Sequence, residues 1–495
     1  MLVDERSADE GLGRGNGKVS ALCGAEDAPA GTRRIDLGGA CVLPGFSDAH
    51  VHFPTWALTR SELQLDGLGS PEAIAALVAE AVAGGSPDRW VRGFGWVAEG
   101  WAPHRTQLDA VSGDVPVALL AHDWHSLWLN SAALARAQGD LETPGGVVER
   151  DEGGEPTGLL REASAWRFRD RFSKATLAEL LEATRAALPE AAARGVVAIH
   201  DKDGMVGALD VHRALRDAGE LTMRVWQSLP AERLGELAGL PERSASAGSR
   251  LRAGYAKAYM DGTLGSRTAR LLDGSGVEVT SRDEFAAIVA RAAELDVPVA
   301  VHAIGDRAVR DALDAFEETA PLWRERGLRH RIEHAQCVAP EDLPRFARLD
   351  VTASVQPAMA PTDRDLAERE WGDRLAGAYA YGSLRHAGAR LAGGSDAPVE
   401  ALDPLDGIRA AVLRTRGDRA PWRPEEALPV EAALAAWTTT PAWLAGEEHL
   451  RGRLAPGLAA DLVVLDRDPL ASEEDLREAR VLATMLDGEW VHGSL

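Results

Sequence analysis

Eight short apolar runs, separated by longer amphipathic stretches, constrain the fold of this sequence more than any other feature. Short apolar runs that alternate with amphipathic helices indicate βαβ units, whose strands form a parallel sheet. Eight such strands are the number that closes a (β/α)₈ or TIM barrel, so we predict an α/β fold of this class. The predicted strands are residues 41–49, 196–200, 223–228, 254–260, 297–302, 329–334, 350–355 and 389–394.

Two capping boxes support this interpretation. Ser281 and Glu284 can bond the free backbone amides at the start of a helix over 283–296, and a second box at Thr176 precedes 177–193. Apolar residues recur at helical spacing within 283–296, as expected for a helix that covers a sheet.

The two ends of the chain differ from its middle. Asp487-Gly488 lies between short apolar runs, and this pair is typical of a β-hairpin turn. We therefore predict a small composite β-sandwich domain, built from both termini beside the barrel. The predicted segments are residues 1–44 and 450–495 for this domain, with partner strands in 18–22 and 33–38, and 45–449 for the barrel.

A long insertion follows the first predicted barrel strand. The segment between the first two strands far exceeds the length of an ordinary connection, and we place the insertion at about 53–165. Aromatic enrichment there suits a lid over a pocket and a small hydrophobic core equally well. The tryptophans of this region and its edge are Trp56, Trp90, Trp96, Trp101, Trp124, Trp128 and Trp166.

Composition limits which partners and which cellular compartment we expect for this protein. The formal net charge is −23, whereas nucleic acids and anionic membranes attract basic surfaces, so neither is an expected partner. The first residues are acidic, unlike a signal peptide, and no apolar run approaches membrane-spanning length. Cys23, Cys41 and Cys337 are too few and too scattered for a disulfide framework. We expect a cytoplasmic protein that binds a small-molecule substrate, and we leave its oligomeric state open, a homo-oligomer included.

The strongest local motif is LPGFSDAHVHF, residues 43–53. His50 and His52 are two residues apart at the end of an apolar run, so on a strand both side chains point to the same face. Two imidazoles on one face can bind a single metal ion. Taken alone, such a pair is equally typical of hydrogen-bonded surface histidines.

Three further residues of ligand type end other predicted strands. His302 follows VPVAV, His334 follows RHRIE and Asp396 follows ARLAGGS. Barrel active sites are built at the carboxyl ends of the strands. A single buried histidine is usually a core residue, but a set of this kind on separate strands favours a metal site.

Lys257 lies in the fourth predicted strand, within YAKAYMDG. Burying an ammonium is costly, and near metal cations its amine should be neutral, because desolvation and like charge both disfavour protonation. A neutral amine can react with carbon dioxide to give a carbamate, whose two oxygens suit a bridge between two metals. The alternative is a lysine that reaches a carboxylate at the rim, such as Asp261.

These motifs together resemble the amidohydrolase superfamily, and within it the amidohydrolase 3 family, whose members are similar to N-substituted formamide deformylase. The resemblance implies a metal-dependent hydrolase with a barrel and a composite β-domain, although the usual first strand is hard to find before residue 18. The motifs that carry it are LPGFSDAHVH, PTGLLREA, YMDGTLGSRTA, VHAIGDRAV, HRIEHAQ, AGGSDAPV and APGLAADLVVLD.

Several other residues match the resemblance or lie beside the predicted site. Glu162, in GLLREA, is a candidate to line the site or to replace Lys257 as a bridge, and a helix-face salt bridge is its alternative. Arg267 has the fork geometry that binds a carboxylate through two hydrogen bonds. The predicted substrate-binding residues are Glu162, His125, Asn130, Arg267 and Trp124.

The expected reaction is hydrolysis of a C–N bond in an amide or an N-formyl or N-acyl amine, by attack of a metal-bound hydroxide. Asp396 would transfer the proton to the leaving nitrogen, and the carbamate of Lys257 would bridge the metals. Two divalent ions fit these ligands, zinc first, with manganese, iron and cobalt as alternatives. One metal would be bound by His50, His52 and Asp396, and the other by His302 and His334.

Two alternatives remain open at this point. A single-metal deaminase of a small heterocycle would use the same ligands, with His334 activating water or orienting the substrate. A metal-free scaffold barrel would lack ligand residues, and none is missing here.

Overall fold

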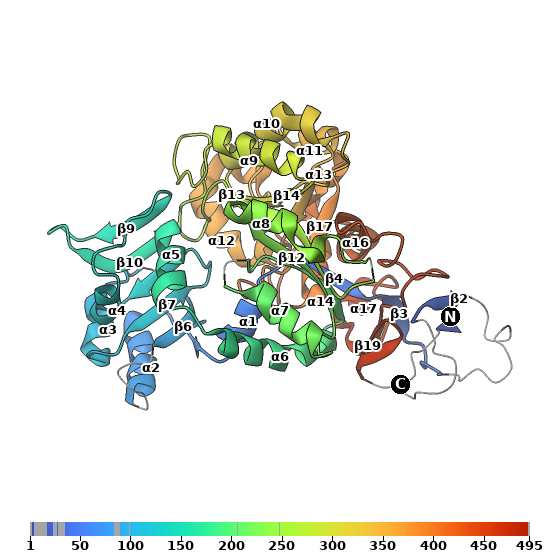
Figure 1. Cartoon of the computed structure of the whole chain (residues 1–495), viewed down its shortest axis with the longest axis horizontal. Coiled ribbons are helices and arrows are strands. Elements are labelled where there is room, and N and C mark those ends of the chain that lie inside the picture. The colour runs from blue at the N-terminus through green and yellow to red at the C-terminus, as the bar shows by residue number, and fades with distance from the viewer. Residues whose placement is uncertain are drawn as a thin grey trace.

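The computed structural model describes residues 2–3, 17–22, 27, 35–83, 90–98, 100–204, 206–246 and 248–493. Within these residues, eight parallel strands form the central sheet in the spatial order β17-β16-β15-β14-β13-β12-β11-β4 (Figure 1). This is the predicted barrel sheet. Its strands are β4 (Phe46–Val51), β11 (Val196–Asp201), β12 (Arg224–Pro230), β13 (Leu251–Tyr259), β14 (Val299–Ala303), β15 (Arg331–His334), β16 (Thr352–Val355) and β17 (Leu391–Gly393).

Backbone hydrogen bonds bring the first and last strands of this sheet together. The amide of Asp396, just after β17, donates to the carbonyl oxygen of His50 at 2.7 Å, and the amide of His52 donates to that of Ala397 at 2.9 Å. These bonds lie at the carboxyl ends of both strands. They therefore place two of the predicted ligand motifs side by side.

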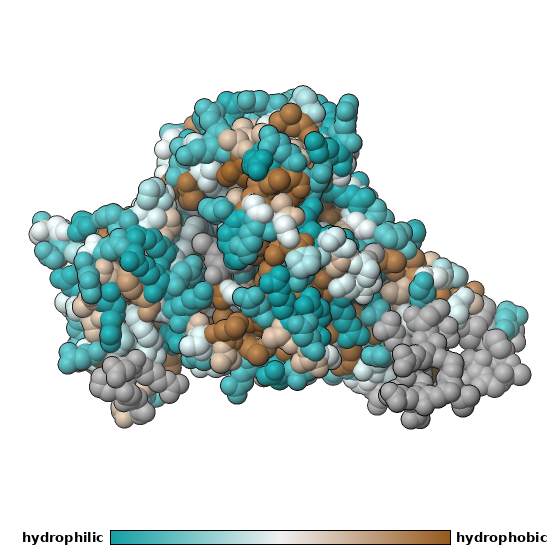
Figure 2. Space-filling model, viewed as in Figure 1, coloured by the Kyte–Doolittle hydropathy of each residue, from teal (hydrophilic) through white to brown (hydrophobic). Residues whose placement is uncertain are grey.

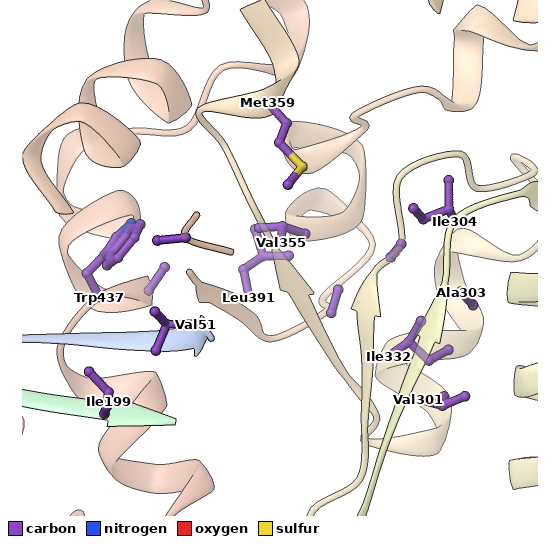
Figure 3. Packing of buried hydrophobic residues seen from close by; sticks show 14 of the residues in the cluster. Val51, Ile199, Val301, Ala303, Ile304, Ile332, Val355, Met359, Leu391 and Trp437 are labelled. Atoms are coloured by element: carbon purple, nitrogen blue, oxygen red, sulfur yellow. The ribbon is translucent and has the colours of Figure 1, made fainter. Parts of the chain in front are cut away.

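Helices cover the outside of the sheet and bury its apolar side chains. Figure 3 shows Val301, Ile332, Val355 and Leu391 on successive strands of this shared core, with Trp437 on the side of Leu391 and Val51. Both predicted capping boxes are formed, at the starts of α6 and α9. The helices are α6 (Leu177–Ala193), α7 (Ala208–Asp217), α8 (Leu234–Gly239), α9 (Arg282–Glu294), α10 (Asp306–Trp323), α11 (Leu343–Leu349), α12 (Met359–Trp371), α13 (Tyr381–His386), α14 (Pro404–Leu413), α15 (Val430–Ala436) and α16 (Thr439–Leu444).

The predicted first strand, residues 41–49, is in fact two strands that belong to different sheets. Gly45 separates them, and a Cβ there would lie 2.5 Å from Cγ1 of Val197, so the chain passes too close to β11 for a larger residue. The strand before it, β3 (Cys41–Pro44), pairs antiparallel with β18 (Leu462–Leu465). An apolar run alone does not reveal where a chain leaves one sheet for another.

Strand β3 completes a four-stranded sheet, in the order β20-β19-β18-β3, with β19 (Val481–Leu486) and β20 (Glu489–His492). The predicted hairpin is present: Asp487 and Gly488 have φ of 52° and 77°, the left-handed values that a type I′ turn requires. The first and last parts of the chain thus share one sheet.

The predicted partner strands were right only in part: Lys18 forms an antiparallel bridge with Ala459, but the main pairing lies elsewhere. Within 18–22, β2 (Val19–Ala21) pairs with β1 (Leu2–Val3) and reaches the C-terminal segment through its amide bond to Leu458. Residues 35–38 form no strand, and residues 33–34 lie outside the described part of the chain. The strand that pairs with β18 is 41–44, which lies in the predicted terminal segment 1–44 and forms the first part of the predicted strand 41–49.

The insertion forms a domain-sized unit with its own mixed sheet, in the order β5-β6-β7-β8-β10-β9, on one side of the barrel (Figure 1). Trp96, Trp101 and Trp128 pack together in its core, whereas Trp124 and Trp166 face the barrel. Trp96 and Trp101 also line the large cavity, so the tryptophans serve both a small core and a pocket wall. The elements are α1 (Phe53–Thr59), β5 (Leu63–Gln64), α2 (Pro71–Ala83), β6 (Val91–Trp96), α3 (Arg105–Ser112), β7 (Val117–Ala121), β8 (Ser126–Leu129), α4 (Ser131–Arg136), β9 (Gly146–Arg150), β10 (Pro156–Glu162) and α5 (Ala163–Phe172).

The surface in Figure 2 is polar over much of the viewed face, with apolar side chains scattered between the polar ones. Among the described helices, none combines the length and the apolar character needed to span a membrane.

Candidate metal centre

Three predicted ligands meet where β4 and β17 end. Nε2 of His50 lies 3.2 Å from Oδ1 of Asp396, and Nε2 of His52 lies 3.5 Å from the same oxygen. Their ligand atoms all lie within 4.8 Å of one another. Two imidazole nitrogens and a carboxylate oxygen at this spacing suit one divalent metal ion.

The opposite nitrogens of both rings are held by buried carboxylates. Nδ1 of His50 lies 2.7 Å from Oε2 of Glu333, and Nδ1 of His52 lies 2.8 Å from Oδ1 of Asp203. A carboxylate on one ring nitrogen fixes the tautomer and leaves the other nitrogen to bind metal. Both Nε2 atoms are therefore the nitrogens that could bind a metal, in agreement with their convergence on Asp396.

The other two predicted histidine ligands lie next to this group. The ring centroid of His334 is 4.9 Å from that of His50 and 4.5 Å from that of His302. Nδ1 of His334 is buried and has no hydrogen-bond partner among the described residues. Burial lowers the pKa of His334 to about 3, so the ring is neutral at pH 7, the form that binds metals.

Lys257 lies on β13 and is almost fully buried, with its Nζ 4.8 Å from the ring centroid of Tyr259. Burial lowers the pKa of its amine below the ordinary value. Among the described residues no ion pair joins Lys257 to Asp261, which instead accepts the backbone amides of Ile304 and Gly305 at 3.0 and 2.8 Å. The rim carboxylate suggested as its alternative partner is thus engaged elsewhere.

The model of the amidohydrolase family matches residues 33–492 of this chain. The chain belongs to the amidohydrolase family. Protein LONG AFTER FAR-RED 3 of Arabidopsis thaliana is 32% identical to it over 93% of this chain and 84% of its own length. N-substituted formamide deformylase of Arthrobacter pascens is 27% identical over 92% and 89% of the two chains.

Solved structures agree with this assignment. A crystal structure described as an uncharacterized metal-dependent hydrolase from Pyrococcus horikoshii OT3 has a TM-score of 0.74 and 29% sequence identity to this amidohydrolase. The match covers 92% of this chain and 93% of that chain. The likeness therefore extends well beyond the barrel strands and helices.

Glu333 is a functional residue that the sequence reasoning missed. Its side chain is fully buried inside the barrel of this amidohydrolase, where Oε1 lies 2.7 Å from Nε of Arg331 and 3.5 Å from Nζ of Lys202. Burial raises the pKa of Glu333, but Arg331 and its other positive neighbours lower it well below the usual range. The carboxylate that holds His50 is therefore charged.

Strand alternation explains why Glu333 was missed. Glu333 and His334 are adjacent, so on a regular strand they would point to opposite faces. His334 ends β15 with a φ of 74°, a left-handed value that is uncommon for a residue with a side chain. This turn of the backbone lets both side chains face the centre. The pattern that could have identified Glu333 is its spacing of two residues from Arg331, because residues two apart on a strand point to the same face.

A cavity of about 710 Å³ separates the barrel mouth of the amidohydrolase from the insertion. The insertion lines it with Trp96, Trp101 and His125, and the barrel with His302, His334 and Asp396. A smaller cavity of about 70 Å³ continues from it to His50, His52 and Lys257. The candidate metal centre is thus the floor of a space large enough for a small-molecule substrate.

The predicted substrate-binding residues fall into two groups. His125, Trp124 and Arg267 line these cavities, and Trp124 lies nearly parallel to the ring of His52 at a centroid distance of 6.4 Å. Arg267 also forms an ion pair with Glu370 at 3.1 Å.

Glu162 and Asn130 lie away from the cavity walls. Glu162 is fully buried behind His125 and holds its Nδ1 at 2.5 Å. Asn130 is fully buried in the insertion, where it caps α4 and accepts the amide of Val117 at 3.0 Å. We propose no substrate contact for Asn130 and no metal bridge for Glu162.

Proposed function

We propose that this amidohydrolase is a metal-dependent hydrolase that cleaves a C–N bond in a small-molecule amide, or in an N-formyl or N-acyl amine. The observation that carries the proposal is the convergence of His50, His52 and Asp396 on one point at the floor of the cavity. The similarity to N-substituted formamide deformylase supports the choice of bond. The net charge of −23 argues against nucleic acid or anionic membranes as partners, and the few scattered cysteines are consistent with a cytoplasmic protein.

The donors of this chain fit two divalent metal ions, zinc first and manganese, iron or cobalt as alternatives. Metals bound there would supply the Lewis acidity that activates water and polarises a carbonyl group. A carbamate on Lys257 would provide an anion between them, since its amine is buried beside both ligand groups. The residues that would hold the metals are His50, His52 and Asp396 on one side, and His302 and His334 on the other.

Asp396 is the proposed proton carrier. Although burial raises its pKa, the neighbouring histidines His50 and His334 lower it well below the usual range, so Asp396 is a carboxylate rather than a carboxylic acid. Its backbone φ is 57°, a strained value of the kind that occurs at functional sites. Asp396 can take a proton from the attacking water and pass it to the leaving nitrogen. Trp124 and Arg267 would bind the rest of the substrate.

A single-metal deaminase is the second candidate, because His50, His52 and Asp396 alone meet the tight spacing among the described residues. Elemental analysis of the purified protein and a panel of N-formyl amines, N-acyl amines and amino-heterocycles separate the two. We expect two metal ions per chain and release of an amine from an N-formyl or N-acyl substrate. One metal ion together with ammonia release from a heterocycle would replace this proposal with the deaminase.

A further inference from the structure

The turn of the insertion between β7 and β8 is tied to the loop that follows barrel strand β13. The hydroxyls of Thr263 and Ser266 donate to Oδ2 of Asp123 at 2.7 and 2.5 Å. On the same side, Arg161 donates from Nη1 to the carbonyl oxygen of Ser266 at 2.7 Å. The turn therefore has a fixed position over the barrel mouth.

This turn carries His125, and a buried carboxylate aims its ring. Nδ1 of His125 lies 2.5 Å from Oε2 of Glu162, while the other oxygen of Glu162 accepts a hydrogen bond from the hydroxyl of Thr268. The amide of Glu162 donates to the carbonyl oxygen of His125 at 2.8 Å. Glu162 has a φ of 52°, an unfavourable backbone conformation that the surrounding contacts maintain.

The barrel loop is shaped to receive this carboxylate. A Cβ at Gly262 would lie 2.3 Å from Oε1 of Glu162 and 2.1 Å from Oγ1 of Thr268, so only glycine fits there. The carbonyl oxygen of Gly262 in turn lies 3.1 Å from Nε2 of His302. Glu162, from the insertion, thus packs against Gly262 of the barrel loop, and Gly262 in turn contacts the predicted metal ligand His302.

The ring of His125 points its other edge toward the reaction space. It packs against Trp166 at a centroid distance of 4.9 Å and against His302 at 5.3 Å. His125 lines both the large cavity and the smaller one above Lys257. Because Glu162 occupies Nδ1, Nε2 is the ring nitrogen that remains for a ligand.

We propose that His125 is a catalytic residue which hydrogen-bonds the scissile amide through Nε2, and that Glu162 and Thr268 are positioning residues which act only through His125. The proposal rests on the amide-hydrolase function given above. It means that the catalytic centre is shared: the barrel provides the metal ligands, and the insertion provides a group that contacts the substrate.

A double-mutant cycle tests this division of roles. His125→Gln removes the imidazole that Glu162 holds, and it should lower kcat by about 10²-fold, the lower range for losing a positioned acid–base group at the reacting amide nitrogen, with two metals still bound. Glu162→Gln should lower kcat in the same direction. The double variant should be no slower than His125→Gln alone, because a positioning residue has nothing left to position.

Matched variants control for damage to the fold. Glu142→Gln removes another carboxylate of the insertion, at an exposed ion pair with Arg150, and should leave kcat unchanged. Thr268→Val should weaken the hold on Glu162 and lower kcat, whereas Thr268→Ser keeps the hydroxyl and should restore it.

Independent, multiplying losses in the double variant, or loss of metal in His125→Gln, would overturn the role of His125. A parent enzyme that holds metal but cleaves no member of the panel would instead contradict the amide-hydrolase function. In that case the same variants can be compared by calorimetric binding of an N-acyl amine. Effects of His125→Gln and Glu162→Gln on affinity that simply add would refute the proposed pairing of His125 with Glu162.

Discussion

Nδ1 of His50 lies 2.7 Å from Oε2 of Glu333, so a carboxylate on the sixth barrel strand fixes a metal-site ring on the first. The opposite oxygen of Glu333 lies 2.7 Å from Nε of Arg331, and both side chains are fully buried. Because the ring is held through Nδ1, its Nε2 faces Asp396. Glu333 therefore orients His50, a predicted metal ligand, although Glu333 is not itself one of the predicted ligands.

Changing Glu333 should weaken metal binding. Glu333→Asp keeps the charge that Arg331 requires but shortens the reach to His50, so we expect a folded protein with about 10- to 100-fold lower metal affinity. Titration of the metal-free protein with zinc measures this directly. Glu473→Asp, at an exposed ion pair with Arg477, is the control and should bind zinc normally. Unchanged affinity in the Glu333 variant would show that His50 needs no such support.

Lys257 should be needed for full metal loading. Lys257→Ala removes the bridging anion, so the variant should lose at least one metal ion and nearly all activity, and added acetate should restore part of both. Lys257→Arg should fail as well, because guanidinium stays cationic and forms no carbamate. Elemental analysis and carbon NMR with labelled bicarbonate are the measurements. An active, fully metallated enzyme with an unmodified ammonium at Lys257 would contradict the bridge.

Asp396 should matter more for turnover than for folding. A Cβ at Gly394 would lie 2.6 Å from the amide nitrogen of His50, so the strand end of β17 is pressed against β4 and sets the carboxylate in place. Asp396→Asn keeps this shape but removes the base, and kcat should fall at least ~10²-fold. The variant must first be shown to hold metal. A metal-replete Asn variant with near-normal kcat would exclude Asp396 as proton carrier.

The barrel was predictable because each βα unit repeats a local pattern, and the capping boxes at Thr176 and Ser281 mark helix starts by side-chain chemistry alone. The division of the predicted strand 41–49 into β3 and β4 was not. Gly45 divides one apolar run because a Cβ at this position would lie 2.5 Å from Cγ1 of Val197, a residue distant in sequence. Strand propensity does not reflect such a long-range contact.

The meeting of the predicted ligands His50, His52 and Asp396 was predictable because strand ends in a barrel lie at one place, whatever the details of packing. The carboxylates that hold them were not, since Asp203 and Glu333 are identified only by which ring nitrogen they touch. For the same reason the sequence did not separate His125, which lines the cavity, from Glu162, which lies behind it.

The terminal sheet should depend on a buried charge cluster that it shares with the barrel. Arg224, at the start of β12, lies 2.8 Å from Asp461 and also pairs with Asp487. Removing one partner of a buried pair costs about 3–5 kcal/mol when the other charge is left alone, and Asp487 should keep the loss below that range. Asp461→Asn should therefore lower the urea midpoint at pH 7, whereas Asp217→Asn, at an exposed pair, should not.

The pH dependence of this pair has a definite sign. Burial raises the pKa of Asp461, but Arg224 lowers it below the ordinary value overall. A depressed native pKa gives stability that is present above the unfolded value of about 4 and is lost as the pH falls through the native value. The urea midpoint of the parent should thus fall on acidification below about pH 4, and that of Asp461→Asn should fall less. Parallel curves for the two proteins would show that Asp461 contributes no linked stability.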